Sequence, residues 1–175
     1  MASPEGRYRR DATTWLCYAG VAWVLGFEVA LGASMPVLRE HLGIGLAVAS
    51  IHLTALAAAG TLSAAISERV TGVPGRGLPF QLSLSLCALG CALIVVSRSA
   101  LWSIVAVTLF GLGGALIVIS AQAELIERHV ANAGVAMAEV NIAASTAMIA
   151  ATLMTGPLVA FDVAGGAARP GRGSS

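Results

Sequence analysis

Two carboxylates lie inside long apolar stretches of this sequence, where a charge is unusual. Glu28 lies within the stretch 13–35, and Glu139 lies near the beginning of the stretch 133–161. If such a stretch crosses a membrane, a charged side chain there costs at least about 2.5 kcal/mol unless it meets a partner or a cavity. Two interpretations of Glu28 stay open: a carboxylate that binds a substrate or a proton, and a protonated group hydrogen-bonded to a neighbouring helix. Glu139 is close enough to a helix end for water to reach it.

Two other polar side chains occur in similar surroundings. His52 is flanked by apolar residues and is either a proton relay or a packed neutral imidazole. Asn141 begins a mildly polar helical face that either lines a cavity or forms hydrogen bonds between helices. The candidates for a substrate or proton pathway are therefore Glu28, Glu139, Asn141 and His52.

The pattern of potential catalytic and ligand residues does not favour an enzyme. The sequence has no Gly-x-Ser-x-Gly element, and its three histidines, at 41, 52 and 129, are far apart. No paired spacing typical of a zinc or haem site occurs. The three cysteines lie within apolar stretches and behave as small apolar residues. We therefore expect no catalytic residues, no metal and no cofactor, and a membrane enzyme is the disfavoured class.

Five apolar stretches must position these side chains. They cover residues 13–35, 46–67, 78–97, 100–123 and 133–161, and each reaches the roughly 20 residues that a helix needs to cross a bilayer. A hydrophobic content of 57% and a mean hydropathy of +0.85 exclude a water-soluble globular protein. Helices of this length satisfy every backbone amide in hydrocarbon. The sequence predicts an all-α integral membrane protein with a five-helix bundle, a short N-terminal segment 1–12 and a disordered tail 162–175.

The arginines predict the orientation, because all ten basic residues are of this type. Cytoplasmic loops carry the excess of positive charge. With the N-terminus in the cytoplasm, the inner side holds Arg7, Arg9, Arg10, Arg69, Arg76 and Arg128, and the outer side holds Arg39, Arg98, Arg169 and Arg172. We therefore expect a multi-pass protein of the cell membrane with a cytoplasmic N-terminus. The net charge of +1 excludes a nucleic-acid partner.

Several short motifs carry a family resemblance. Glu68 and Arg69 are followed by Gly75-Arg76 in the connection after the second stretch, a glycine-rich segment runs from Leu109 to Ala115, and the fifth stretch contains Gly156-Pro157. In their order these motifs resemble the amino-terminal half of the major facilitator superfamily, over roughly residues 12–160. The arginine usual in that family's fourth helix is Val107 here.

The resemblance implies a secondary transporter of a small solute, in which two six-helix halves rock around a central site. It implies a conformational role for the loop residues Glu68, Arg69, Gly75 and Arg76. It also implies helix packing at Gly111, Gly114, Gly156 and Pro157, where small residues let helices approach.

Because only the first five helices of such a half are matched, we expect a truncated or partial copy. The alternative is a non-transporting membrane scaffold or assembly subunit derived from a transporter. The expected partners are membrane lipid, an unidentified solute, and a second copy or another membrane protein.

Overall fold

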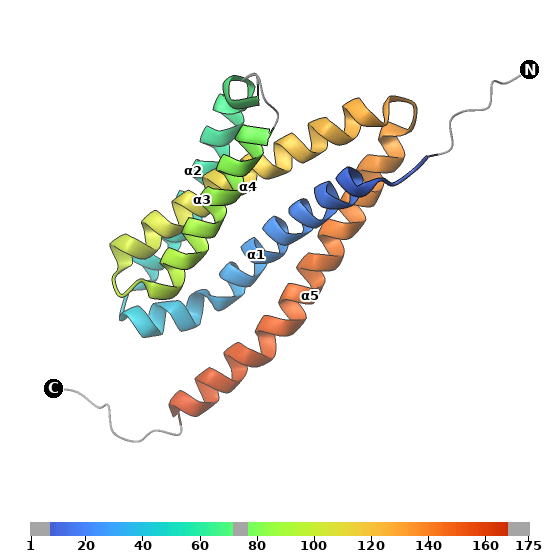
Figure 1. Cartoon of the computed structure of the whole chain (residues 1–175). Helices are drawn as coiled ribbons and strands as arrows, with labels where there is room; N and C mark the ends of the chain where they lie inside the picture. The colour runs from blue at the N-terminus through green and yellow to red at the C-terminus, as the bar shows by residue number, and fades with distance from the viewer. Residues whose placement is uncertain (1–7, 72–76, 168–175) are drawn as a thin grey trace, which may run out of the picture.

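The computed structural model describes residues 8–71 and 77–167, and within them it forms five α-helices and a short 3₁₀ turn (Figure 1). The helices are α1 (Ala12–Leu42), α2 (Leu46–Thr71), α3 (Gly77–Val96), α4 (Ala100–Arg128) and α5 (Ala133–Ala167). The turn, η1 (Val130–Asn132), joins α4 to α5. The predicted all-α membrane bundle is confirmed.

Four segments are long and apolar enough to cross a membrane, judged by length and composition: Ala12–Leu42, Leu46–Ser67, Ala100–Arg128 and Val130–Ala160. The part of α3 whose side chains are described, Phe80–Val96, is a shorter apolar helix. The chain is therefore a multi-pass membrane protein.

The helix ends differ from those expected from the apolar stretches. α1 continues past Met35, through Pro36, and ends at Leu42. Gly43 stops it with a φ of 64°, a left-handed conformation that glycine adopts without strain, and the amide of Ile44 donates to the carbonyl of Arg39 at 3.1 Å. The backbone of α5 likewise runs to Ala167, into the segment predicted as a tail. The apolar stretches end where polar residues begin, but the backbone hydrogen bonds of α1 and α5 continue beyond those positions.

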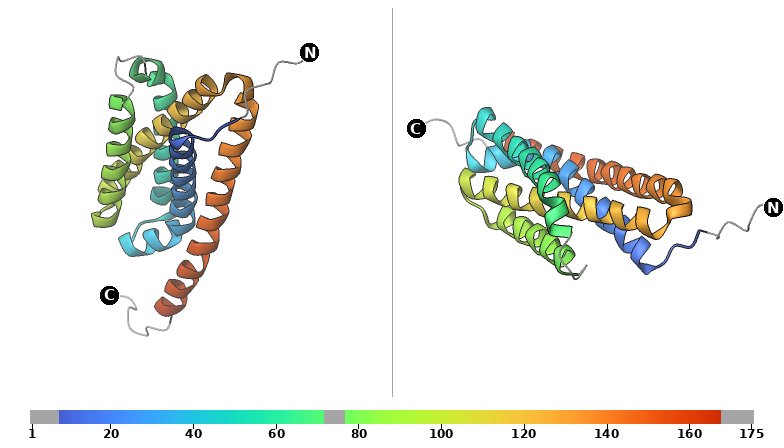
Figure 2. Two further views of the ribbon diagram at one scale, coloured as in Figure 1. Left: turned by 45° about the vertical axis from the view of Figure 1, so that its right-hand side comes forward. Right: turned by 90° about the horizontal axis from the view of Figure 1, so that it is seen from above.

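α4 is the central helix of the bundle. It packs against α1, α2, α3 and α5, with α1 and α5 side by side along one flank and α2 and α3 on the other (Figures 1 and 2). Three of its large side chains, Phe110, Ile117 and Leu125, are almost completely buried. The N-terminal end of α1 lies beside the turn between α4 and α5 (Figure 1).

Glycines allow α4 to approach three neighbours closely. A Cβ atom added to Gly111 would lie 3.0 Å from the Ala59 side chain of α2, and one added to Gly114 would lie 2.9 Å from Val24 of α1. The contact with α3 is tighter, since a Cβ on Gly113 would lie 2.5 Å from the carbonyl oxygen of Ser83. Helix packing of this kind depends on small residues at the contact.

Gly156 and Pro157, the other residues expected to pack against a neighbouring helix, lie on an open side of α5. A Cβ on Gly156 would meet nothing within 4 Å, and Pro157 lies inside α5 with an exposed side chain. Within the described residues, this part of α5 forms none of the close helix contacts expected for it, because α1 and α5 diverge toward their C-terminal ends (Figure 1).

Candidate functional site

Glu28 lies in the middle of α1 and is half-buried. Among the described residues it forms no hydrogen bond and no ion pair, so the neighbour-helix hydrogen bond considered for it is absent from this structure. Val24, one turn earlier, is fully buried in the cluster that joins α1 to α4. Glu28 is therefore a polar group within a membrane-spanning helix, without a hydrogen-bond or ion-pair partner in residues 8–71 and 77–167.

Glu139 has strong partners. The guanidinium of Arg10 pairs with both carboxylate oxygens, donating from Nε to Oε2 at 2.8 Å and from Nη2 to Oε1. The hydroxyl of Tyr18 donates to Oε2 at 3.0 Å. The hydrogen bond from Arg10 to Glu139 raises the pKa of Arg10 further above its ordinary value. Glu139 thus ties the segment before α1 to the beginning of α5, a contact that the sequence did not reveal.

A second set of contacts reinforces this end of the bundle. Arg128 donates from Nη1 to Asp11 at 2.9 Å and from Nη2 to Glu124 at 2.8 Å. Asp11 also caps α1, and the hydrogen bonds that it accepts from the amide and hydroxyl of Thr14 lower its pKa. Because the Thr14 hydroxyl donates to Asp11, Nε2 of His129, 2.9 Å away, is the donor to Thr14.

We call these residues the N-terminal clamp: Arg10, Asp11, Thr14, Tyr18, Glu124, Arg128, His129 and Glu139. The clamp joins the start of α1 to both sides of the α4–α5 connection. Its charged members are near a membrane surface, since they lie at helix ends. This arrangement holds the ends of α1, α4 and α5 together.

His52 is fully buried between α2 and α4. Its Nδ1 donates to the carbonyl of Val48 at 3.0 Å, and its Nε2 lies 2.7 Å from the hydroxyl of Ser103. A carbonyl can only accept, so a neutral ring carries its proton on Nδ1. Its Nε2 then shares the single Ser103 hydroxyl proton with the carbonyl of Ala100, which lies 2.9 Å from the Ser103 oxygen. Both ring nitrogens therefore have partners, as in the packed neutral interpretation of this residue.

Asn141 lies on an exposed face of α5, as do Ser145, Met148 and Thr152. The hydroxyl of Thr152 donates to the carbonyl of Met148 in its own helix at 2.9 Å. No hydrogen bond or ion pair within the described chain joins any two of the four candidates Glu28, Glu139, Asn141 and His52. The structure thus places the four residues in different surroundings. Glu139 pairs with Arg10, His52 is packed between helices, Asn141 is exposed, and Glu28 has no hydrogen-bond or ion-pair partner among the described residues.

The loop motif is described only in part. Glu68 belongs to the last turns of α2, but its side chain lies outside the described residues, and Arg69 is exposed. Gly75 and Arg76 lie outside the described residues. The conformational role expected for these four residues remains a prediction.

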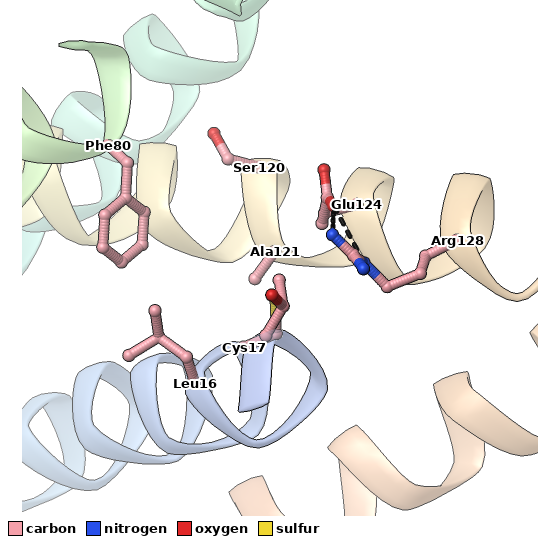
Figure 3. A pocket seen from close by; sticks show the side chains of 8 residues that line it. Leu16, Cys17, Phe80, Ser120, Ala121, Glu124 and Arg128 are labelled. Carbon is pink, nitrogen blue, oxygen red and sulfur yellow. Dashed lines mark hydrogen bonds and ion pairs between the residues drawn. The ribbon is translucent and has the colours of Figure 1, made fainter. Parts of the chain in front are cut away.

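A pocket of about 370 Å³ opens beside the clamp, between α1, α3 and α4 (Figure 3). It is lined by Thr13, Leu16, Cys17, Phe80, Ser120, Ala121, Glu124 and Arg128. Leu16 and Phe80 reach toward one another from α1 and α3, while Glu124 and Arg128 form the charged end on α4 (Figure 3). Across the described segments, no group of three or more His, Cys, Asp or Glu residues is placed to hold a metal ion.

Comparison with known proteins identifies the family. The family model described as Major Facilitator Superfamily matches residues 3–152, which include α1 to α4 and half of α5. No curated protein and no solved structure matches the chain. The matched family consists of transporters rather than enzymes, so a transporter-type function follows in general. The resemblance carried by the sequence motifs is therefore confirmed: this chain belongs to the Major Facilitator Superfamily.

Proposed function

We propose that this chain provides one helical bundle of a secondary transporter that moves a small solute across the cell membrane. Transporters of this kind work by alternating access, in which two bundles rock against each other around a site near the middle of the membrane. The α1–α5 bundle would work against a second bundle, which in a membrane that contains this chain alone is a second copy of it. The family match and the four segments able to span a membrane support this proposal.

The observation that points to one residue is the carboxyl group of Glu28, which has no hydrogen-bond or ion-pair partner in the part of the chain that the structure describes. Ionisable groups inside membrane-spanning helices are costly, and they mark ion, proton or substrate pathways unless they pair with protein groups. Glu28 lies near the middle of α1, and no described residue pairs with it. We propose that it binds either a proton or a cationic group of the solute during the transport cycle.

The test of this role compares Glu28→Gln with the unmodified protein. Glutamine has nearly the same shape and keeps hydrogen bonding, but it can neither ionise nor neutralise a cation. The protein would be reconstituted into liposomes containing a pH-sensitive dye. Proton movement and the uptake of cationic, neutral and anionic solutes would be measured from about pH 5 to about pH 8.

Glu127→Gln is the matched control, because this substitution also removes one carboxylate from the chain but acts on an exposed side chain near the end of α4. We expect Glu28→Gln to abolish uptake or its pH dependence and Glu127→Gln to preserve both. Uptake that is saturable and unchanged in Glu28→Gln at every pH would refute the role of Glu28. A correctly inserted protein that moves none of the solutes would instead support the scaffold interpretation.

We also propose that the N-terminus, the clamp and the α2–α3 connection face the cytoplasm. The support is the distribution of arginines, which are more numerous on that side of the predicted topology.

A further inference from the structure

The outward side of α5 faces the membrane. Of the four segments able to span a membrane, Val130–Ala160, which is almost entirely α5, has the smallest share of buried residues. α5 also lies at the edge of the bundle (Figures 1 and 2). Ile142, Ile149 and Leu153 are 62–69% exposed along this helix. Large apolar side chains on a membrane-spanning helix contact lipid tails or another helix, so this side of α5 is open to both.

Asn141 lies on the exposed side of α5, and its amide has no hydrogen-bond partner among the described residues. Three threonines further along the helix differ from it, because each donates its hydroxyl to a carbonyl of α5 itself; they are Thr146, Thr152 and Thr155. Ser145 can bond to its own helix in the same way by rotating its hydroxyl. The amide of Asn141 has two N–H donors and a carbonyl acceptor, so it is the polar group on this side that needs an outside partner.

The amide of Asn141 lies within the hydrocarbon layer. The middle of the segment Val130–Ala160 is residue 145, and Asn141 is four residues from it, or about 6 Å at 1.5 Å per residue. Half the thickness of the hydrocarbon core is about 15 Å. Lipid tails offer neither a donor nor an acceptor at that depth, so a partner for this amide comes from another helix.

We propose that two copies of this chain associate through the exposed side of α5, with Asn141 of each copy hydrogen-bonded to Asn141 of the other. Copies with the same orientation in the membrane are related by a two-fold axis along the membrane normal, which puts each residue at the depth of its counterpart. An asparagine both donates and accepts, so this side of α5 is complementary to itself. Ala138 and Ser145 share a helical face with Asn141, and their small side chains let two backbones approach closely.

The proposal rests on the proposed function for its partner, a second copy of the bundle, and it adds the face at which the two copies meet. Association and uptake are separate measurements. A dimer that moves no solute contradicts the transport proposal alone, whereas a monomer that moves solute contradicts the α5 contact alone.

The test measures association in phosphatidylcholine vesicles. The chain contains no lysine, so a succinimidyl dye attaches to its N-terminal amine, and energy transfer between donor-labelled and acceptor-labelled copies reports association. Increasing the ratio of lipid to protein gives the dissociation constant. We expect Asn141→Leu to raise this constant about tenfold, an effect typical of hydrogen bonds between membrane helices. Asn141→Gln should keep most of the association, because glutamine keeps the amide.

Thr146→Val is the matched control for the loss of the amide. Thr146 is likewise an exposed polar residue of α5, but its hydroxyl already donates to the carbonyl of Ile142 at 2.8 Å. Its removal should therefore leave the dissociation constant unchanged. Circular dichroism and the melting temperature would establish that each variant is folded.

Disulfide formation locates the contact on α5. In a background without the native cysteines, Ser145→Cys should form a disulfide with its counterpart under mild oxidation, because both lie near the two-fold axis. Ala150→Cys should not, since Ala150 is also exposed but lies about 140° further around the same helix.

Three results would overturn the proposal. The first is a chain that stays monomeric at every ratio of lipid to protein. The second is an unchanged dissociation constant in folded Asn141→Leu. The third is a disulfide in Ala150→Cys and none in Ser145→Cys, which would place the contact on another side of α5.

Discussion

The tight contact between α3 and α4 leads to a quantitative prediction about Gly113. A Cβ atom on Gly113 would lie 2.5 Å from the carbonyl oxygen of Ser83 and 2.9 Å from the amide nitrogen of Cys87. Both are backbone atoms, which cannot rotate away. An ordinary contact begins at 3.4 Å, so Gly113→Ala would require α3 and α4 to separate locally by about 0.9 Å, the difference between 3.4 and 2.5 Å. Overpacking of this kind costs about 1–3 kcal/mol.

Gly32→Ala is the matched control for this substitution. Gly32 also lies inside a helix, but a Cβ there would meet nothing within 4 Å. Both variants gain the same helix propensity from alanine, so the difference between them isolates the clash. With about 2–4 °C per kcal/mol for a chain of this size, Gly113→Ala should melt about 2–12 °C below Gly32→Ala.

The assay is thermal unfolding in one detergent, followed by circular dichroism and by the reactivity of Cys87, which is fully buried at this contact. Reaction of Cys87 with a small thiol reagent should become faster in Gly113→Ala, because separation of the helices exposes it. Equal melting temperatures for the two variants, together with unchanged Cys87 reactivity, would refute the close approach of α3 and α4.

Three further predictions concern the clamp, the α2–α4 contact and the orientation. Folding lowers the pKa of Asp11 below its ordinary value of 3.8. The stability that the carboxylate contributes is therefore present above pH 3.8 and is lost as the pH falls through the lower pKa of the folded protein. The difference in melting temperature between Asp11→Asn and the unmodified protein should vanish in that acidic range. Ser103→Ala should cost about 1–3 kcal/mol, because the buried Nε2 of His52 loses its partner, and an unchanged melting temperature would contradict the assigned hydrogen bond. In a cysteine-free background, a cysteine at Leu42 should react with an impermeant reagent added to intact cells and one at Thr71 should not, whereas the opposite pattern would reverse the proposed orientation.

Several features of the fold could be predicted because they depend on properties of single segments. The long apolar stretches require helices in hydrocarbon, where each backbone amide needs a partner within its own segment. The small residues Gly111 and Gly114 indicated a helix able to approach others closely, and α4 is the helix at the centre of the bundle. The motif order indicated the family that the comparison then showed.

The interpretation of the polar residues depended on which helices meet. Glu28 and Glu139 looked alike in the sequence, as carboxylates within apolar stretches. In the structure, Arg10 reaches Glu139 from 129 positions away along the chain, whereas Glu28 finds no partner in the described residues. No periodicity within one helix contains this distinction, because the pairing partner belongs to another segment.

The sequence by itself determined that the helices of this protein lie in a membrane, and it indicated the secondary structure and the family. The length of an apolar stretch and the order of local motifs are properties of each segment alone. Only the tertiary structure showed that the hydroxyl of Ser103 lies against Nε2 of His52 and that α4 approaches α3 closely at Gly113. It also showed that Glu124 and Arg128 line a pocket together with Leu16 and Phe80. The physical reason is that hydrogen bonds, close packing and cavities between helices depend on the rotation and crossing of each helix relative to its neighbours. Many such arrangements share the same apolar pattern, and the side-chain contacts select one of them.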